Sequence, residues 1–247
     1  MSNANGAWKS RLYNAYVSSE QAAPALKENA ELMFRPRKAF LTHVISHHLP
    51  ANRDVRILDL GCGHGAFLYF LSQAGYRNVS GIDVSPEQVE VAHKLGIAEA
   101  RLGHLEDLLC DESDGCIDAV LAMDVLEHLT RDELFYTLDH IHRVLKRNGI
   151  CIAHVPNAEG LYGMRIRYGD LTHEQAFTPT SVRQVFRTIG FSKVSCYEDK
   201  PVVHGVKSLA RRMIWDAGTL YHRALLSAET GTTSAVLSQN MLIKAVS

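Results

Sequence analysis

The chain has 247 residues, a formal net charge of -1 with neutral histidines, 46% hydrophobic residues and 21% charged residues. This is the composition of an ordinary globular protein that can bury a core without disulfides or structural metal ions. Because the net charge is close to zero, no basic field exists to attract a phosphate backbone, and we expect no nucleic-acid partner.

The cysteines and the first residues bear on the compartment. There are five cysteines at irregular spacings and no C-x-x-C pair, which disfavours a zinc ribbon or a thioredoxin-like site and predicts reduced thiols. The first residues lack the apolar stretch of a signal peptide, and no run of about 18 apolar residues predicts a membrane span. We therefore expect a cytoplasmic protein and leave peripheral membrane contact open.

In chain order, residues 1–50 are expected to form a helical extension that folds over the site, ending in a helix over 37–49 that Pro50 stops. Residues 51–247 form the main domain, with insertions at 156–177 and 204–236. Strands are predicted where short apolar runs meet turn residues, at 55–60, 79–83, 100–102, 117–122, 149–155, 193–197 and 241–246. Further helices are predicted from periodicity and capping residues, starting at 66, starting at 86, from 131 to a stop at Asn148-Gly149, over 178–188 and over 206–226.

The alternation of strands and helices from 55 to 155 predicts a doubly wound α/β fold with a parallel sheet. The predicted helix over 206–226 is less ordinary. It carries apolar residues on one side, with Arg211 and Arg212 nearby; the apolar residues are Val206, Leu209, Met213, Ala217, Leu220 and Leu225. Such a helix packs on the core or on a partner chain, which leaves a homodimer open, or it lies at an interface where it meets a lipid-linked substrate.

A nucleotide site is indicated after the first two strands. Gly61, Gly63 and Gly65 let the backbone turn sharply and let a ligand approach main-chain N–H groups, and Asp83 closes the next strand, where a carboxylate grips ribose hydroxyls. The glycine spacing is not the G-x-G-x-x-G of dinucleotide sites, and Asp59 is a poor neighbour for a pyrophosphate. A carboxylate suits the ammonium group of S-adenosylmethionine, which carries no phosphate.

At these residues the sequence resembles the class I S-adenosylmethionine-dependent methyltransferases. The matching blocks are ILDLGCGHG, GIDVSPEQVEVA, GHLEDL, IDAVLAMDVLEHL and HVPN, in the family's order across roughly residues 55–157. The branch with VLEH after the fourth strand includes ubiquinone-biosynthesis O-methyltransferases and sugar-modifying methyltransferases. The resemblance implies a Rossmann-like, mainly parallel seven-stranded sheet with helices on both faces and an antiparallel last strand.

The resemblance also implies roles for individual residues. The three glycines, with Cys62 between them, should pass under the methionine part and the ribose, while Asp59 lies near the ammonium group. Asp83 should bind the ribose hydroxyls. Val84, Leu105 and Glu106 should lie around the adenine. Met123 and Asp124 should flank the methionyl group, and Arg37 should reach the cofactor carboxylate. His104 stands where the family often has aspartate.

Catalysis of methyl transfer needs the acceptor held in line and one proton managed. The base candidates are histidines near the carboxyl ends of the fourth and fifth strands: His128 and His173 as the catalytic pair, and His154, which also fits a buried structural histidine. No spacing demands a metal, although Glu127, Asp170 and these histidines could gather a divalent ion.

The sequence thus predicts methyl transfer from S-adenosylmethionine to an oxygen or nitrogen of a small or lipid-linked acceptor, such as a sugar or glycan precursor or a quinone-like molecule. Two alternatives remain at this stage. One is a module that binds S-adenosylmethionine without catalysis, and the other is an NAD-dependent dehydrogenase, which the glycine spacing and Asp59 disfavour.

Overall fold

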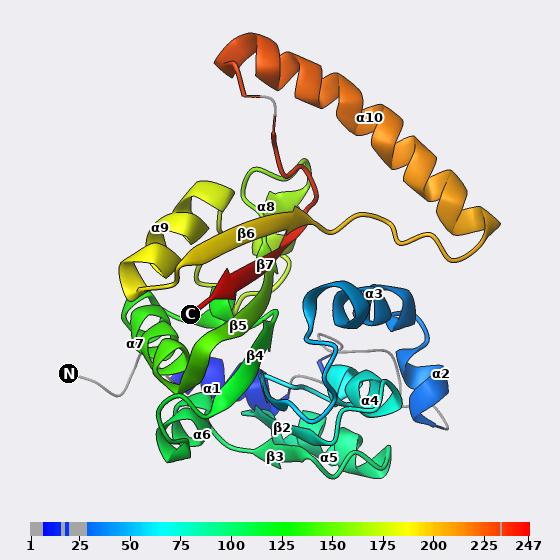
Figure 1. Cartoon of the computed structure of the whole chain (residues 1–247). Helices are drawn as coiled ribbons and strands as arrows, with labels where there is room; N and C mark the ends of the chain where they lie inside the picture. The colour runs from blue at the N-terminus through cyan, green and yellow to red at the C-terminus, as the bar shows by residue number, and fades with distance from the viewer. Residues whose placement is uncertain (1–6, 16–17, 20–28, 233) are drawn as a thin grey trace.

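The computed structural model describes residues 7–15, 18–19, 29–232 and 234–247, and one mixed sheet runs through its centre (Figure 1). The seven strands are β1 (Arg56–Leu60), β2 (Asn78–Asp83), β3 (Ala100–Leu102), β4 (Ile117–Met123), β5 (Leu145–Pro156), β6 (Lys193–Glu198) and β7 (Asn240–Val246). Their order is β3-β2-β1-β4-β5-β7-β6, and β7 runs antiparallel to both of its neighbours while the other pairs are parallel. The predicted Rossmann-like, doubly wound fold is confirmed.

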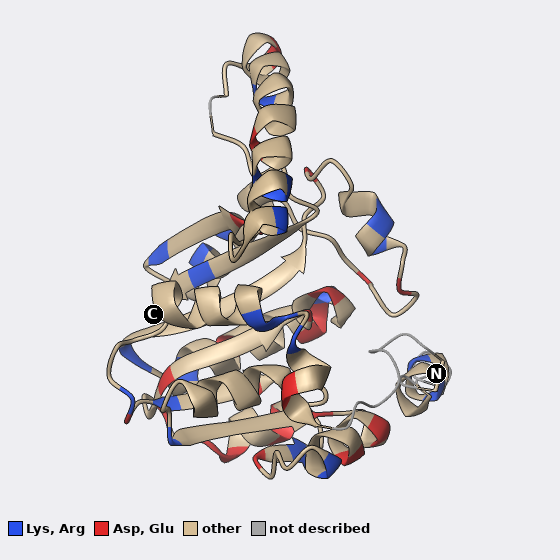
Figure 2. Cartoon of the chain, turned by 90° about the vertical axis from the view of Figure 1, so that its right-hand side faces the viewer, with Lys and Arg blue, Asp and Glu red and all other residues tan. Residues whose placement is uncertain are grey.

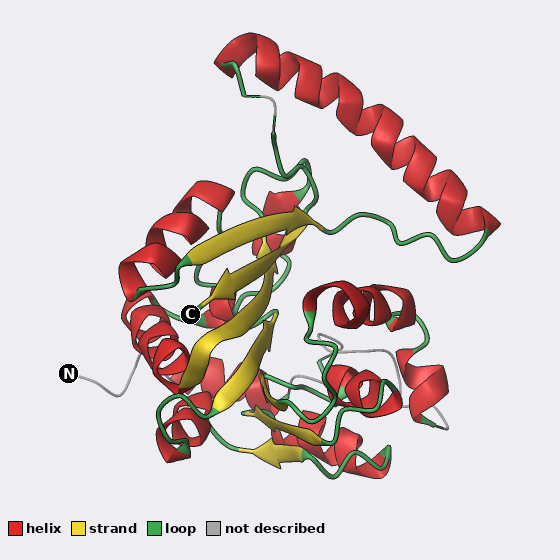
Figure 3. Cartoon of the chain, in the orientation of Figure 1, coloured by secondary structure: helices red, strands yellow, loops and turns green. Residues whose placement is uncertain are grey.

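Helices cover both faces of the sheet (Figure 3). On one face the buried residues of α2 (Ala30–Phe34), α3 (Lys38–His48), α4 (Ala66–Gln73) and α5 (Pro86–Lys94) join one core cluster. On the other face α6 (Leu105–Asp111), α7 (Arg131–Val144) and α9 (Pro179–Ile189) build a second cluster. Shorter elements are α1 (Ala7–Asn14), the 3-10 turn η1 (Leu126–His128) and α8 (Gly163–Arg167).

Local sequence explains where several elements begin. All but two residues of β4 are buried, as a strand covered on both faces requires. Helix α7 begins with a capping box in which the Thr130 hydroxyl accepts the Glu133 N–H and the Glu133 carboxylate accepts the Thr130 N–H. The Ser85 hydroxyl caps α5 by accepting the Gln88 N–H, and Pro86 takes the first position of this helix.

The predicted end of α7 was wrong. The helix ends at Val144, four residues before the expected Asn148-Gly149 stop, and β5 begins at Leu145. The carbonyls of Arg143 and Val144 accept N–H groups of the loop before β4, from Gly115 at 3.0 Å and Cys116 at 2.9 Å. These bonds draw the chain into the sheet, where Leu145 pairs with Ile117. Helices α6 and α8 were not predicted either, because each is shorter than the window in which helical periodicity shows.

Helix α10 (Val206–Thr230) joins β6 to β7 within the segment 204–236, and it stands off from the rest of the chain at the top of Figure 1. It extends four residues beyond the predicted end. None of the helices among the described residues has the length and apolar character needed to cross a lipid bilayer.

Candidate active site

The turn after β1 depends on its glycines. Gly61, Gly63 and Gly65 have φ angles of +66°, +55° and +83°, a left-handed conformation that other residues adopt only with strain. A Cβ on Gly61 would lie 2.3 Å from Cγ2 of Val125, and one on Gly65 would lie 2.8 Å from Cδ1 of Ile97. The turn therefore passes so close to its neighbours that only glycine fits.

Asp83, at the end of β2, locks this turn from the side. Its Oδ2 accepts the N–H of Gly63 and its Oδ1 accepts the N–H of Ser85, both at 2.8 Å. Burial raises the pKa of Asp83, and these two backbone bonds act in the opposite direction. A carboxylate has about four lone-pair positions, so each oxygen keeps capacity for a further donor such as a ribose hydroxyl.

Asp59, on β1, is the buried carboxyl group beneath the turn. It is 2% exposed, and its Oδ2 has no hydrogen-bond partner among the described residues. Burial raises its pKa to about 8, the charge of Asp83 adds to that rise, and Arg37 opposes it. An unpaired buried carboxyl is costly, and a ligand ammonium group would satisfy it.

A cavity of about 740 Å³ opens above these groups, at the carboxyl ends of β1, β2 and β4. Parallel α/β sheets bind ligands at this edge. Of the twelve residues predicted to bind the cofactor, Gly65 alone does not line the cavity; the lining ones are Arg37, Asp59, Gly61, Cys62, Gly63, Asp83, Val84, Leu105, Glu106, Met123 and Asp124. Cys62 is buried, and burial raises the pKa of its thiol, so it contributes shape rather than a reactive thiolate.

Helix α1 forms part of the cavity wall through Lys9, Ser10, Tyr13 and Asn14. Lys9 donates from Nζ to the carbonyl of His128 at 3.0 Å and forms an ion pair with Glu174 at 3.0 Å. The Ser85 hydroxyl donates to the carbonyl of Tyr13 at 3.0 Å. Of the two tyrosines in the N-terminal segment, Tyr13 lines the cavity and Tyr16 lies outside the described residues, and no pattern in the sequence indicated the contacts that Lys9 makes.

Asp124 follows β4 with a left-handed φ of +59°, an uncommon conformation for a residue other than glycine. His154 donates from Nδ1 to Asp124 Oδ1 at 2.5 Å, and its Nε2 lies 3.4 Å from Asp199. Burial alone would lower the pKa of His154, but the two carboxylates outweigh burial and raise the pKa to about 10. His154 is therefore a buried cation that holds Asp124, rather than a base, and Arg37 lies 3.4 Å from the second oxygen of Asp124.

His128 lines the cavity and is oriented by a line of hydrogen bonds. The Thr172 hydroxyl donates to Asp170 Oδ1 at 2.6 Å and lies 2.8 Å from His128 Nδ1. Since the single Thr172 proton goes to the carboxylate, His128 Nδ1 carries the proton and donates it, which leaves the lone pair on Nε2. Burial, and then the charge of His173, lower the pKa of His128 to about 4, so the imidazole is neutral at physiological pH.

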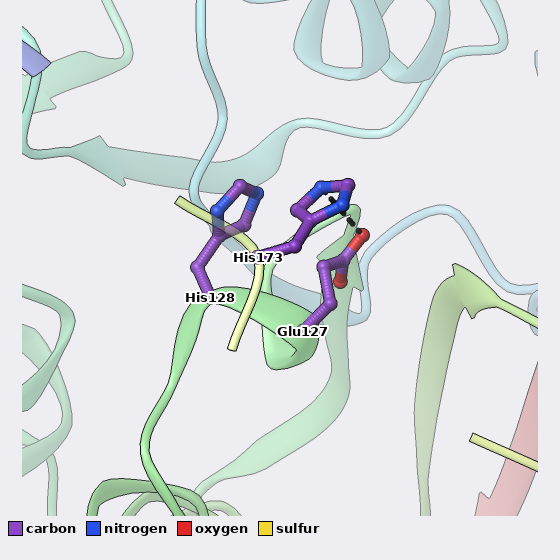
Figure 4. A group of neighbouring side chains, drawn as sticks. All are labelled: Glu127, His128 and His173. Carbon is purple, nitrogen blue, oxygen red and sulfur yellow. Dashed lines mark ion pairs between the residues drawn. The ribbon is translucent and has the colours of Figure 1, made fainter. Parts of the chain in front are cut away.

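His173 does not line the cavity. Its ring lies against His128, with centroids 4.6 Å apart, and its Nε2 faces Glu127 at 4.0 Å (Figure 4). Glu127, His128 and His173 offer ligand atoms within 4.8 Å of one another, so these three residues could hold a divalent cation. Burial and the charge of Asp124 raise the pKa of Glu127 well above its usual value, however, and a carboxyl that ionises less readily is a weaker cation ligand.

The histidines of the site could be identified from the sequence, but the groups that orient them could not. Thr172 and Asp170 were visible in the D-x-T-H stretch but received no orienting role, because their contact with His128 joins residues 44 positions apart. Gln88 is another residue of the site that was not identified from the sequence. It lines the cavity and lies 2.9 Å from His64 through its side chain.

Comparisons with known proteins agree with this geometry. A family model described as a methyltransferase domain matches residues 22–196. Among curated proteins, the mitochondrial ubiquinone biosynthesis O-methyltransferase of Mus musculus is 30% identical over 168 residues, which cover 60% of this chain and 44% of that protein. The O-antigen chain terminator bifunctional methyltransferase/kinase WbdD of Escherichia coli is 29% identical over 101 residues, which cover 38% of this chain and 14% of that protein. The chain thus spans less than half the length of these relatives.

Among solved structures, a SAM-dependent methyltransferase from Archaeoglobus fulgidus superposes with a TM-score of 0.64 at 19% identity, covering 94% of this chain and 99% of that one. The family match covers most of the chain, and the fold agrees with it. The chain belongs to the methyltransferase-domain family and carries the fold of the S-adenosylmethionine-dependent methyltransferases. The predicted enzyme class and its cofactor, S-adenosylmethionine, are confirmed at the level of the family.

Proposed function

We propose that the chain transfers a methyl group to a hydroxyl oxygen of a small or lipid-linked acceptor, with His128 as the general base. The observation that carries this proposal is the line from Asp170 through Thr172 to His128, which fixes a neutral imidazole at the cavity wall. A hydroxyl acceptor must lose a proton during transfer, whereas an amine acceptor only needs to be neutral. A base with a fixed tautomer therefore favours oxygen over nitrogen.

When bound, S-adenosylmethionine supplies a methyl group on a sulfonium, which passes to the acceptor oxygen while its bonding electrons stay on sulfur. His128 takes the hydroxyl proton at Nε2 and becomes imidazolium. Thr172 accepts the Nδ1 hydrogen bond throughout, and Asp170 stabilises the developing positive charge through the Thr172 hydroxyl. Tyr13, whose ring centroid lies 6.3 Å from that of His128, closes the same wall and excludes water.

The cofactor roles follow from the cavity. Asp83 keeps lone pairs for the ribose hydroxyls, and Asp59 offers its unpaired oxygen to the ammonium group. Arg37 supports binding of the ligand carboxylate, because its guanidinium lines the cavity beside Asp124. His173 acts as a positioning residue behind His128, because its ring contacts the His128 ring but does not line the cavity.

The acceptor class rests on the relatives. The mouse protein is named for ubiquinone biosynthesis and the Escherichia coli protein for O-antigen chain termination. Both names fit acceptors with a hydroxyl group, so we propose a sugar or glycan precursor or a quinone-like phenol.

The test is turnover of S-adenosylmethionine to S-adenosylhomocysteine against a panel of sugar hydroxyls, phenols and amines. We expect methylated hydroxyl products. We expect His128→Gln to lower kcat by about 100-fold, within the usual range for a general base. Thr172→Val should lower kcat by roughly tenfold and Thr172→Ser should restore it, because serine keeps the hydroxyl that orients the imidazole.

Affinity for S-adenosylhomocysteine serves as the control, and we expect it to stay within about twofold in all three variants because none of them holds the cofactor. If Thr172→Val and Thr172→Ser had equal kcat, the orienting role would be wrong. If only amines were methylated, the assignment of a hydroxyl acceptor would be wrong.

A further inference from the structure

The outward side of α10 is both apolar and exposed to solvent. Residues with reduced exposure on this helix recur on one side, including Ser208, Trp215 and Thr219, and that side faces the body. The opposite side carries large exposed apolar residues, among them Val206 at 85%, Ile214 at 74% and Leu220 at 68%. The full outer face consists of Val206, Leu209, Ala210, Met213, Ile214, Ala217, Leu220, Tyr221, Ala224, Leu225 and Ala228, all exposed. An apolar face of this length on a soluble domain marks a contact surface.

The outer face is symmetric about its midpoint. Each of its residues has an apolar counterpart at the same distance on the other side of Ala217; the pairs are Val206 with Ala228, Leu209 with Leu225, Ala210 with Ala224, Met213 with Tyr221 and Ile214 with Leu220. An apolar stripe that reads the same in both directions complements an identical helix that runs antiparallel to it. A two-fold axis between two copies produces this arrangement.

The small residues of the outer face favour a helical partner. Ala210, Ala217 and Ala224 recur every seven residues along the middle of the stripe, which is the spacing of positions that face a second helix. With alanine at each of them, two helix axes can approach closely while the larger side chains interlock beside the seam. In Figure 2 most of the α10 ribbon has the colour of uncharged residues, so little charge opposes such contact.

The charges on one flank of the outer face are also complementary to a reversed copy. Lys207 lies near the start of α10 and Glu229 near its end, on the same flank of the helix. An antiparallel pair brings Lys207 of each copy within a turn of Glu229 of the other. A parallel pair would instead put like charges at the same end and leave each of them without an opposite charge across the seam.

We propose that α10 is a dimerisation helix, which pairs antiparallel with α10 of a second copy of this chain about a two-fold axis at Ala217. In that pairing Met213 packs beside Leu220 of the second copy and Ile214 packs beside Tyr221 of the second copy. A 25-residue helix is about 37 Å long. One face of that length buries less than the roughly 1,600 Å² of a standard interface, so the dimer dissociates in the micromolar range.

Sedimentation equilibrium from about 1 to 200 µM tests the proposal on the full chain. We expect a reversible dimer for the wild type and at least a tenfold larger dissociation constant for Ala217→Glu, which sets two carboxylates against each other at the axis. His222→Glu is the matched control, because it adds the same charge five residues away on a flank outside the outer face. We expect it to dimerise like the wild type.

Cross-linking tests the direction of pairing, in a background where the exposed Cys110 is replaced by serine. Ala217→Cys should form a disulfide-linked dimer under mild oxidation, and His222→Cys should not. Ala210→Cys and Ala224→Cys should cross-link when mixed but not alone, because an antiparallel pair separates identical positions by about 21 Å.

Three outcomes would overturn the proposal. One is a monomer at every concentration with no cross-linked Ala217→Cys dimer. The second is efficient cross-linking of Ala210→Cys alone, which would indicate a parallel pair. The third is a monomeric chain that sediments with vesicles of phosphatidylcholine and phosphatidylglycerol, which would assign the outer face to a lipid surface.

Discussion

Replacing Gly61 by alanine would test the glycine turn after β1 most sharply, because the substitution is destabilising for two independent reasons. Its φ of +66° costs an L-residue about 1–2 kcal/mol. The new Cβ would also lie 2.3 Å from Cγ2 of Val125, and Val125 must move because real contacts are never so short. Overpacking of this kind costs about 1–3 kcal/mol. We therefore expect Gly61→Ala to lose roughly 2–5 kcal/mol of unfolding free energy.

Gly115 supplies the matched control. Its φ is +61°, almost the same as that of Gly61, yet a Cβ there would have no atom within 4 Å. Gly115→Ala should therefore pay the backbone penalty alone, about 1–2 kcal/mol.

Urea denaturation of both variants, with calorimetric titration of S-adenosylhomocysteine, measures the difference. We expect Gly61→Ala to be less stable than Gly115→Ala by about 1–3 kcal/mol, and we expect only Gly61→Ala to bind the ligand more weakly, because Val125 lines the cavity. Equal losses of stability and equal affinities in the two variants would refute the close approach of the turn to Val125.

Three further predictions concern titratable groups. Asp59 has a pKa of about 8 in the free chain, so its ionisation on binding an ammonium group should release a proton. The affinity for S-adenosylhomocysteine should rise by up to about tenfold per pH unit between pH 5.5 and 7. The affinity for adenosine, which lacks the ammonium group, should stay constant over the same range. If calorimetry showed the same pH dependence for both ligands, the role of Asp59 would be wrong. Folding raises the pKa of His154 from 6.5 to about 10, so its stabilising effect is complete below pH 6.5 and is lost as pH rises toward 10. This rise in pKa corresponds to ~5 kcal/mol of stability at 1.36 kcal/mol per unit. Because the Asp124 side chain is 42% exposed and screened by solvent, we expect His154 to contribute about 2 kcal/mol. The measurement compares the unfolding free energies of the wild type and His154→Asn at pH 6 and pH 9.5, and a difference between the two proteins that does not change with pH would contradict the prediction. Because burial and the charge of Asp124 raise the pKa of the Glu127 carboxyl and so weaken it as a cation ligand, EDTA should leave turnover unchanged. Loss of turnover that a divalent metal restores would show that the site holds a cation.

The parts of the site that neighbouring residues determine could be predicted from the sequence. The glycine turn follows a buried strand and Asp83 ends the next one, so parallel pairing of β1 with β2 brings them together. The contacts that orient His128 could not be predicted, because they come from Lys9, 119 residues away, and Thr172, 44 residues away. The function of His154 also depends on distant groups, since two carboxylates decide whether the buried imidazole is charged.

Helix α10 shows a different limit of sequence reasoning. The apolar stripe from Val206 to Leu225 was visible, but periodicity does not tell which side of a helix faces the core. In the structure the body-facing side includes Ser208, Trp215 and Thr219, and the stripe faces outward. Of the alternatives that the sequence left open for this helix, packing of the stripe on the chain's own core does not fit its exposure.

The central claim is that the hollow between the glycine turn and the end of β2 takes an adenosyl ligand through Asp83. Calorimetric titration of S-adenosylhomocysteine into the wild type and into Asp83→Asn tests it most directly. We predict saturable one-to-one binding by the wild type, at least about tenfold weaker binding by the variant because one charged acceptor is lost, and no binding of NAD by either. Equal affinity in the two proteins, or no binding by the wild type, would contradict the claim.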